Sequence, residues 1–344
     1  MTPALRVLNP GPHSSLQDLG RPGYQRMGVA RGGALDGLGA RAANALVGNR
    51  AGTGVVECIL AGFAFALEAE GARVAFFGGR APVRVRSSTR RDIGPAEVGR
   101  TMKLSRGDVV EVGTISSSST LYMAVEGGFR VAPRLGSVST DLRGGFGGFE
   151  GRLIKAGDLL PLALDDVPDA ETMVLQGVDL AVPGKLRVVE GPQAGHFSIV
   201  ERDRFFSSTY ALASSSNRMA AKLVGPVLAH AGGFNIVSDG MVPGSIQVPG
   251  DGSPIVLRSE SQTTGGYPKI GVVISADLPA LGRAPVGAAL SFERVSMAQA
   301  EAAAREFAAL ARSLPDRVVP ARERDVAALL STANLISGVV DASA

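Results

Sequence analysis

The residues best suited to chemistry lie in one polar loop between two strand-like segments. The loop spans residues 259–269 and reads Ser-Glu-Ser-Gln-Thr-Thr-Gly-Gly-Tyr-Pro-Lys. Its amide and hydroxyl groups both donate and accept hydrogen bonds, and its paired glycines let a ligand approach the backbone. We predict that the loop binds a planar amide or urea group. The alternative is a hairpin loop whose polar groups satisfy one another. The proposed binding residues are Gln262, Thr263, Thr264, Gly265, Gly266 and Tyr267.

A second polar cluster lies near the N-terminus, beside a predicted turn. Gln17, Asp18 and Arg21 bring an amide, a carboxylate and a guanidinium close together in sequence. We predict that they contact the substrate. The alternative is that Asp18 and Arg21 pair with each other and stiffen the turn.

A glycine-rich segment follows the run Gly-Ser-Val-Ser-Thr-Asp at residues 136–141. Such a segment can turn several backbone N–H groups toward an anion, as a nest does. It is not a P-loop, because it lacks the Gly-Lys-Ser/Thr end. We predict an anion- or nucleotide-binding loop, and the alternative is a tight loop that closes a barrel. The residues concerned are Gly144, Gly145, Gly147, Gly148 and Arg152.

Arg218 follows Asn217 between two apolar segments, where a guanidinium could bind a carboxylate or phosphate or hold backbone carbonyls.

The histidines and the cysteine give little support to metal or thiol chemistry. None of the histidines, at positions 13, 196 and 230, stands at metal-ligand spacing from a second ligand, so we predict no metal site. Cys58 lies in an apolar run and is predicted to be an inert core residue.

The composition and the charge of the chain limit the classes of protein to which it could belong. With 344 residues, 45% of them hydrophobic, the chain is long and apolar enough for two folded domains. No apolar run approaches the roughly 20 residues that span a bilayer, and no signal peptide is evident. The net charge of +3 is spread out, unlike the dense basic patch of a nucleic-acid-binding protein. A single cysteine favours a reducing, cytoplasmic location.

Short strands dominate the elements that must position these side chains. Their spacing, with Gly or Pro between them, predicts a barrel or sandwich. Asp36 is predicted to cap a helix that runs to residue 47 and stops at Gly48. A second helix begins at Ser296, where Gln299 completes a capping box, and a third segment covers residues 324–336. The clearest strands are expected at residues 55–59, 63–67, 73–77, 83–86, 109–112 and 120–125.

The chain also contains a weak internal sequence repeat. Leu-Arg-Val at residues 186–188 repeats Leu-Arg-Val at residues 5–7, and each is followed by a Gly-Pro turn. An acidic, proline-containing stretch at residues 165–171 separates the two copies and is predicted to be a linker. We therefore predict a duplicated barrel, with domains at 1–165 and 166–295 and a helical segment at 296–344.

Taken together, these runs resemble the biotin-dependent carboxyltransferase family, also called allophanate hydrolase subunit 2. The family includes the C subunit of bacterial ATP-dependent 5-oxoprolinase, the antagonist of the sporulation-kinase inhibitor and the C-terminal carboxyltransferase region of urea carboxylase. Each run alone is weak evidence for the family, but the occurrence of all of them in the family's order is specific. The matching runs are QDLGR at 17–21, GALD at 33–36, ANALVGN at 43–49, GSVSTD at 136–141, GGFEGR at 147–152, SNRM at 216–219, IQVP at 246–249 and QTTGGYP at 262–268.

The resemblance implies a mainly β fold of two cyclophilin-like barrels with C-terminal helices. It also implies a B-type subunit of related fold, and an A-type subunit in the complete enzyme. In 5-oxoprolinase, ATP would phosphorylate the lactam oxygen and water would open the ring to glutamate, with ATP and Mg bound by the complex. On this hypothesis Asp141 and Lys269 are catalytic, and Asn217, Arg218 and Gln247 join the substrate-binding residues.

The resemblance leaves two other functions open. One is carboxyl transfer from carboxybiotin to urea or a related amide, because biotin's ureido ring, urea and a lactam present nearly the same face. The other is a regulator that binds a kinase inhibitor without catalysis. The chain departs from the family pattern at Ala220, Ala221, Glu260 and Tyr210, which leaves the substrate open.

Overall fold

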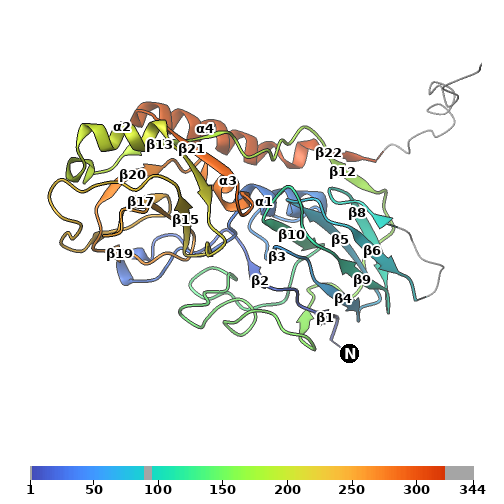
Figure 1. The fold of residues 1–344 in the computed structure, drawn as a ribbon. Coiled ribbons are helices and arrows are strands. Elements are labelled where there is room, and N and C mark those ends of the chain that lie inside the picture. Colours follow the sequence, from blue (N-terminus) through green and yellow to red (C-terminus); the bar gives the residue numbers. More distant parts are fainter. Residues whose placement is uncertain (1, 89–94, 322–344) are drawn as a thin grey trace, which may run out of the picture.

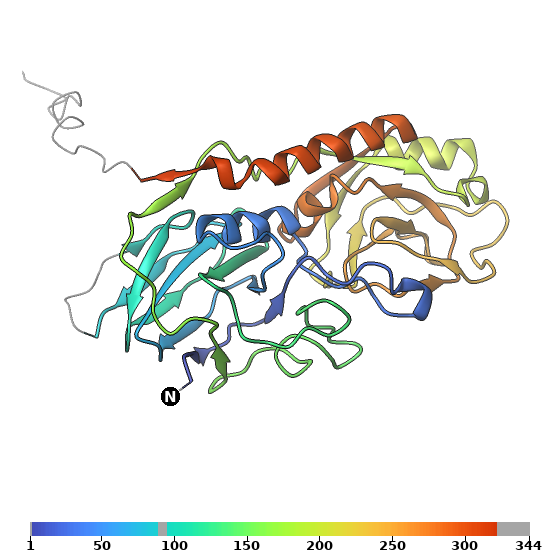
Figure 2. The ribbon, with the colours of Figure 1, turned by 180° about the vertical axis from the view of Figure 1, so that it is seen from behind.

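The computed structural model describes residues 2–88 and 95–321. Two β-rich units lie side by side, and a long helix near the end of the described chain runs along one side of both (Figure 1). Figure 2 shows the same arrangement from behind. The first unit contains two larger sheets and the second contains a closed barrel. The predicted fold class, mainly β with a few helices, is confirmed.

The first unit is built from a six-stranded and a five-stranded sheet. Their strand orders are β11-β1-β4-β9-β6-β7 and β2-β3-β10-β5-β8. In β6, Val83 and Val85 are buried whereas Arg84 and Arg86 are exposed, as expected where one strand face meets the core. The strands are β1 (Ala4–Asn9), β2 (Ser14–Gln17), β3 (Val55–Ile59), β4 (Ala64–Leu67), β5 (Gly71–Phe77), β6 (Val83–Arg86), β7 (Pro95–Ala96), β8 (Thr101–Ser105), β9 (Val109–Val112), β10 (Thr120–Val125) and β11 (Leu159–Pro161).

Strand β10 is buried along its whole length because both of its faces are covered. Leu121 and Met123 join the apolar core of the first unit. Tyr122 and Ala124 pack instead with alanines of helix α1 (Gly37–Leu46). This explains why β10 is one continuous apolar run rather than an alternating one.

Helix α1 begins where the sequence predicts and ends at Leu46, one residue before the predicted end. The carboxylate of Asp36 accepts hydrogen bonds from the backbone N–H groups of Leu38 and Gly39. Gly48 follows the helix with a φ of 71°, a conformation that favours glycine. The prediction that Asp36 is a cap is therefore confirmed.

The second unit is a barrel with the strand order β13-β20-β17-β18-β15-β14-β21. It closes through a parallel pair, β13 with β21. Its core includes Phe205 of α2 (Ile199–Ser207) stacked on Phe292, with 4.6 Å between ring centroids. A two-stranded ribbon of β16 (Asp239–Gly240) and β19 (Thr264–Gly265) lies outside the barrel. The barrel strands are β13 (Lys185–Glu190), β14 (Thr209–Leu212), β15 (Ala220–Val224), β17 (Ser245–Gln247), β18 (Ile255–Leu257), β20 (Lys269–Val273) and β21 (Ala289–Arg294).

The C-terminal part of the described chain returns to the first unit. Helix α4 (Met297–Ser313) starts with the predicted capping box of Ser296 and Gln299. Its apolar residues pack with α1, and β22 (Val318–Pro320) then pairs with β12 (Met173–Leu175). The helix predicted at 324–336 lies outside the described residues. The remaining short elements are α3 (Leu278–Arg283) and the 3-10 helices η1 (Gln25–Met27), η2 (Ala194–His196) and η3 (Pro315–Arg317).

Candidate functional site

The polar loop between β18 and β20 lines a cavity of about 430 Å³. Gln262, Thr263 and Thr264 form one wall, and Asp141 and Gly144 belong to the same lining. Residues predicted from distant parts of the chain therefore meet in one place. The remaining lining residues are Gly28, Val29, Ala30, Arg143, Phe146, Glu260 and Ser261.

Both units contribute to this cavity, and backbone contacts hold its walls in place. The N–H of Gly32 donates to the carbonyl of Ser259 at 2.9 Å, which ties the segment at 28–32 to the polar loop. The N–H of Met241 donates to the carbonyl of Thr263 at 2.9 Å and secures the loop from its other side. A cavity shared by two packed units is a common place for a small ligand.

Asp141 is held by the glycine-rich segment that follows it. Its carbonyl accepts a hydrogen bond from the N–H of Gly145, and its own N–H donates to the carbonyl of Phe146, both at 2.9 Å. One carboxylate oxygen accepts from the N–H of Gly144 at 2.8 Å. The side chain is largely buried yet lines the cavity. This fixed orientation suits a carboxylate that moves a proton or accepts a substrate N–H.

Gln247 and Lys269 lie beside the polar loop but do not line the cavity. Gln262 donates to Gln247 Oε1 at 3.3 Å, and Gln247 Nε2 is buried without a partner among the described residues. Lys269 Nζ donates to Asp239 Oδ2 at 2.5 Å and to the Gly240 carbonyl at 2.9 Å. Lys269 thus secures the β16–β19 ribbon, and its predicted catalytic role gains no support from this position.

The Lys269 ammonium is the main cause of the low pKa of Asp239. Hydrogen bonds from Lys269, Gln193 and the Gly240 N–H lower that pKa to about 2. The carboxylate is therefore charged at every ordinary pH. The ribbon that carries Thr264 is anchored by this pair.

Asp18 and Arg21 form no ion pair with each other among the described contacts, contrary to the alternative in which they stiffen the turn together. Asp18 accepts hydrogen bonds from the hydroxyls of Ser137 and Ser139 at 2.7 and 2.6 Å. Arg21 donates through Nη2 to the Ser139 carbonyl and lies over the Phe146 ring, 4.8 Å from its centroid. Both residues therefore shape the 137–146 segment.

Arg21 retains unused hydrogen-bonding capacity close to the cavity. Its side chain is 1% exposed, and Nε and Nη1 have no partner among the described residues. Burial lowers the pKa of Arg21, while Asp141 acts in the opposite direction. Gln17 is buried nearby, and its Oε1 likewise has no partner in the described part of the chain. Arg21, whose guanidinium lies over the Phe146 ring, and Gln17 therefore leave buried donors and an acceptor unpaired within the described chain.

Neither Asn217 nor Arg218 lines the cavity, and Arg218 lies at the junction of the two units. Asn217 Oδ1 accepts from the N–H groups of Met219 and Ala220 and so shapes a turn. The guanidinium of Arg218 is 2% exposed, pairs with Glu57 and Glu260, and donates to the Gly33 carbonyl. These contacts match the alternative in which Arg218 holds a backbone carbonyl better than the one in which it binds a carboxylate or phosphate of a ligand.

Close packing accounts for Gly147 and Gly148 of the glycine-rich segment. A Cβ at Gly147 would lie 2.2 Å from the Ser139 carbonyl oxygen, and one at Gly148 would lie 1.8 Å from Thr140 Oγ1. Arg152 is occupied by Glu150 and Asp158. The tight-loop alternative accounts for these contacts, and the nucleotide-binding role stays a prediction.

The remaining predicted positions flank the cavity rather than line it. A Cβ at Gly265 would lie 2.6 Å from Gln247 Nε2, which explains that glycine. Gly266 accepts a backbone hydrogen bond from Ile236, and Tyr267 is exposed. Sequence reasoning missed the lining residues at 28–30 and Arg143, because nothing local marks a residue that faces another unit.

The described residues contain no cluster of His, Cys, Asp or Glu able to hold a metal ion. None of the described helices has the length and apolar content needed to span a bilayer.

A family model described as carboxyltransferase domain, subdomain A and B, matches residues 27–294. The chain is 35% identical over 297 residues to the C subunit of 5-oxoprolinase from Escherichia coli, covering 86% of this chain and 93% of that protein. It is 29% identical over 314 residues to urea amidolyase of Saccharomyces cerevisiae, covering 85% of this chain but only 17% of that enzyme. The crystal structure of Kluyveromyces lactis urea carboxylase is similar with a TM-score of 0.79 and 26% identity, covering 94% of this chain and 31% of that one.

Proposed function

This chain belongs to the carboxyltransferase domain family, and we propose that it is a subunit of an ATP-dependent 5-oxoprolinase that acts with a B-type subunit of related fold. One observation carries the proposal. Gln262, Thr263 and Thr264 share one cavity with Asp141 in a chain that is 35% identical to the C subunit of a 5-oxoprolinase. An A-type subunit would complete the enzyme.

The reaction needs an activated amide. 5-Oxoproline is a lactam, and resonance makes its C–N bond slow to hydrolyse. ATP supplies a phosphoryl group for the amide oxygen. One water then adds to the carbonyl carbon, the C–N bond breaks as the nitrogen takes a proton, and a second water releases phosphate. The products are glutamate, ADP and phosphate.

The residues of the cavity match the polar face of a lactam. The amide of Gln262 and the hydroxyls of Thr263 and Thr264 can donate to the lactam oxygen and accept from its N–H. Asp141 is held by Gly144 and supplies or removes the proton at the ring nitrogen. A site that hydrogen-bonds a polar substrate discriminates strongly against analogues that lack the matching group.

The anionic groups of the substrates need a cation at the same wall. Arg143 lines the cavity, is exposed, and forms no ion pair among the described residues. We assign to Arg143 the contact with the substrate carboxylate or a phosphoryl oxygen, since Arg218 and Lys269 are occupied elsewhere. ATP and Mg would be bound by the assembled complex.

A second candidate is carboxyl transfer from carboxybiotin to urea or a related amide. The matching domain family and the urea amidolyase relative favour it. The same loop would then bind urea, because urea and a lactam share a planar O=C–N–H face. This reaction requires a biotin carboxylase from other subunits.

Reconstitution with the B-type and A-type subunits tests the proposal. The complex should release glutamate from 5-oxoproline only when ATP is present. Urea should not stimulate ATP hydrolysis, and carboxybiotin should not be consumed. Stimulation by urea with consumption of carboxybiotin would establish the second candidate instead.

Substitutions in the loop connect that activity to the cavity. We expect Gln262→Ala and Thr264→Ala each to lower turnover by about 10²-fold, as removal of a preorganised hydrogen-bonding group does. Gln176→Ala and Thr209→Ala remove the same residue types from exposed positions and should leave turnover unchanged. Full activity of both loop variants, with the complex intact, would refute the assignment.

A further inference from the structure

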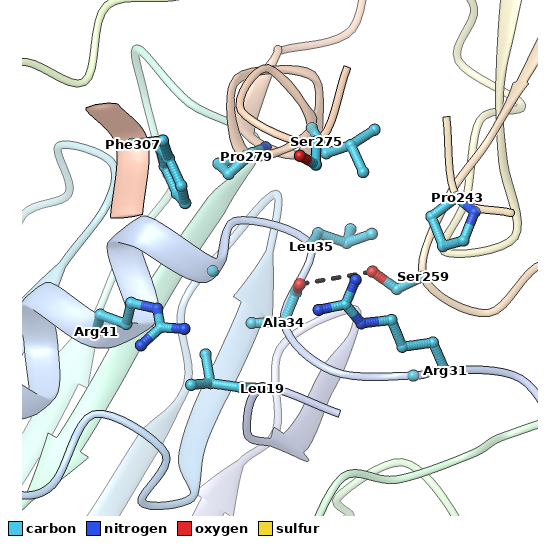
Figure 3. Close-up of a pocket in the computed structure, with 13 residues that line it drawn as sticks. Leu19, Arg31, Ala34, Leu35, Arg41, Pro243, Ser259, Ser275, Pro279 and Phe307 are labelled. Atoms are coloured by element: carbon cyan, nitrogen blue, oxygen red, sulfur yellow. Dashed lines mark hydrogen bonds between the residues drawn. The ribbon is translucent and has the colours of Figure 1, made fainter. Parts of the chain in front are cut away.

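A second cavity, of about 200 Å³, lies where the first unit, the second unit and helix α4 meet (Figure 3). Leu19 and Leu35 come from the first unit, Pro279 from the second, and Phe307 from α4. It is separate from the cavity that holds Gln262. The two cavities share no lining residue, and Gly32 and Ser259, which are joined by a backbone hydrogen bond, line only the second.

Two arginines supply all the charge of this second cavity. Among the described residues that line it, only Arg31 and Arg41 are ionisable, and neither guanidinium forms an ion pair or a hydrogen bond within the described chain. Figure 3 shows their guanidinium groups turned toward the space between them. Arg31 is exposed and Arg41 is half-buried. Unpaired cations that face one cavity are a binding site for an anion.

The two charges also act on each other. The pKa of Arg41 is lowered first by burial and then by the neighbouring charge of Arg31. An anion placed between them would remove this repulsion. In the absence of a ligand, the burial of Arg41 and its repulsion by Arg31 both oppose the charged, folded state.

The rest of the lining selects the kind of anion. Leu19, Leu35, Pro279 and Phe307 present apolar surface, which a phosphate ion would not cover. The hydroxyl of Ser259 points at the Ala34 carbonyl, 3.5 Å away, on the side of the arginines (Figure 3). A ligand with a carboxylate at one end and a compact apolar body at the other matches both parts of the lining.

We infer that this second cavity binds a small organic carboxylate, with its charged group between Arg31 and Arg41 and its apolar body against Phe307 and Leu35. Because Phe307 belongs to α4, the ligand would join that helix to the first unit. The inference concerns binding to this chain alone and does not depend on the reaction proposed above.

Cyclopentanecarboxylate and its uncharged amide form a matched pair of probes. Thermal unfolding and calorimetric titration of the full chain should show saturable stabilisation by the carboxylate and none by cyclopentanecarboxamide. Inorganic phosphate should bind more weakly than the carboxylate. Equal binding of the amide, or tighter binding of phosphate, would overturn the inference.

Arginine variants locate the site. Arg31→Gln and Arg41→Gln should each weaken carboxylate binding by at least about tenfold, the effect of losing a charge-assisted hydrogen bond. Arg84→Gln, at an exposed position of β6, should bind as the unaltered chain does.

Stability without ligand separates a binding role from a structural one. Arg41→Gln should unfold at the same temperature as the unaltered chain or higher, because it removes a repulsion. A lower unfolding temperature in the absence of ligand, or unchanged carboxylate binding by both variants, would show that these arginines support the fold instead.

Discussion

Arg218 of the second unit pairs with Glu57 of the first, and their side chains are 2% and 0% exposed. Glu57 also accepts hydrogen bonds from Tyr122 Oη and from the Leu35 N–H, each at 2.8 Å. Burial first, and then the charge of Glu57, raise the pKa of Tyr122 and keep its hydroxyl protonated. The two units thus share a buried charged cluster that ends at Glu260, which lies 2.7 Å from Arg218 Nε and lines the candidate site.

Removing the Arg218 cation from this buried charged cluster should destabilise the protein strongly. We expect Arg218→Met to lower the free energy of unfolding by about 3–5 kcal/mol, since it leaves Glu57 and Glu260 buried without the cation that pairs with both. Urea-induced unfolding followed by circular dichroism measures the loss. Arg86→Met is the matched control, because Arg86 and Glu111 are 61% and 43% exposed and should contribute no more than about 1 kcal/mol. Equal losses in the two variants would contradict this account.

A glycine holds the two units close together. A Cβ at Gly282 in α3 would lie 2.1 Å from the Leu35 carbonyl oxygen, so Gly282→Ala must push the backbones apart. We expect a loss of about 1–3 kcal/mol in the free energy of unfolding, as in an overpacked core. Gly184→Ala is the control, because no atom lies within 4 Å of its added Cβ. Similar urea midpoints for the two variants would show that the contact relaxes without cost.

Local signals in the sequence predicted the ends of two helices. Asp36 caps α1, Gly48 follows it with a positive φ, and Ser296 with Gln299 starts α4 as predicted. Each of these features depends on residues within one or two turns of chain. Strand positions followed from short apolar runs for the same reason.

Long-range contacts could not be predicted in this way. Arg218 and Glu57 are 161 residues apart in sequence, and nothing near either residue identifies its partner. Asp18 likewise binds serines more than 100 residues away instead of its neighbour Arg21. A catalytic role for Asp141 was predicted only through the resemblance to the family, and nothing in the sequence near it points to Gln262. The separate cavity at Arg31 and Arg41 had no sequence signal, because its walls come from three parts of the chain.

The thiol of Cys58 should be inert in the folded protein. Its side chain is 1% exposed, and burial raises its pKa to about 12. Iodoacetamide at pH 8 should therefore leave the native protein unlabelled, because the thiolate is the reactive form. The chain contains one cysteine, so unfolding in urea should admit one label per chain by mass spectrometry. Rapid labelling without urea would disprove the buried position.

The ion pair of Asp239 and Lys269 should make the stability of the folded state depend on pH in the acidic range. Folding lowers the pKa of Asp239 from 3.8 to about 2, so this carboxylate stabilises the folded state above about pH 4. The contribution is lost as the pH falls from 4 toward 2, where the unfolded chain binds the proton first. The difference in urea midpoint between the unaltered chain and Asp239→Asn should therefore be constant above pH 5 and narrow below pH 4.

A second substitution identifies the cause of that narrowing. Lys269→Met removes the ammonium that is the largest contributor to the low pKa of Asp239. In this background, Asp239→Asn should change the urea midpoint with much less dependence on pH. The contrary result is that the difference in urea midpoint narrows below pH 4 by the same amount without Lys269. The Gln193 amide and the Gly240 N–H would then be what lowers the pKa of Asp239, and the ribbon that carries Thr264 would not depend on the ion pair.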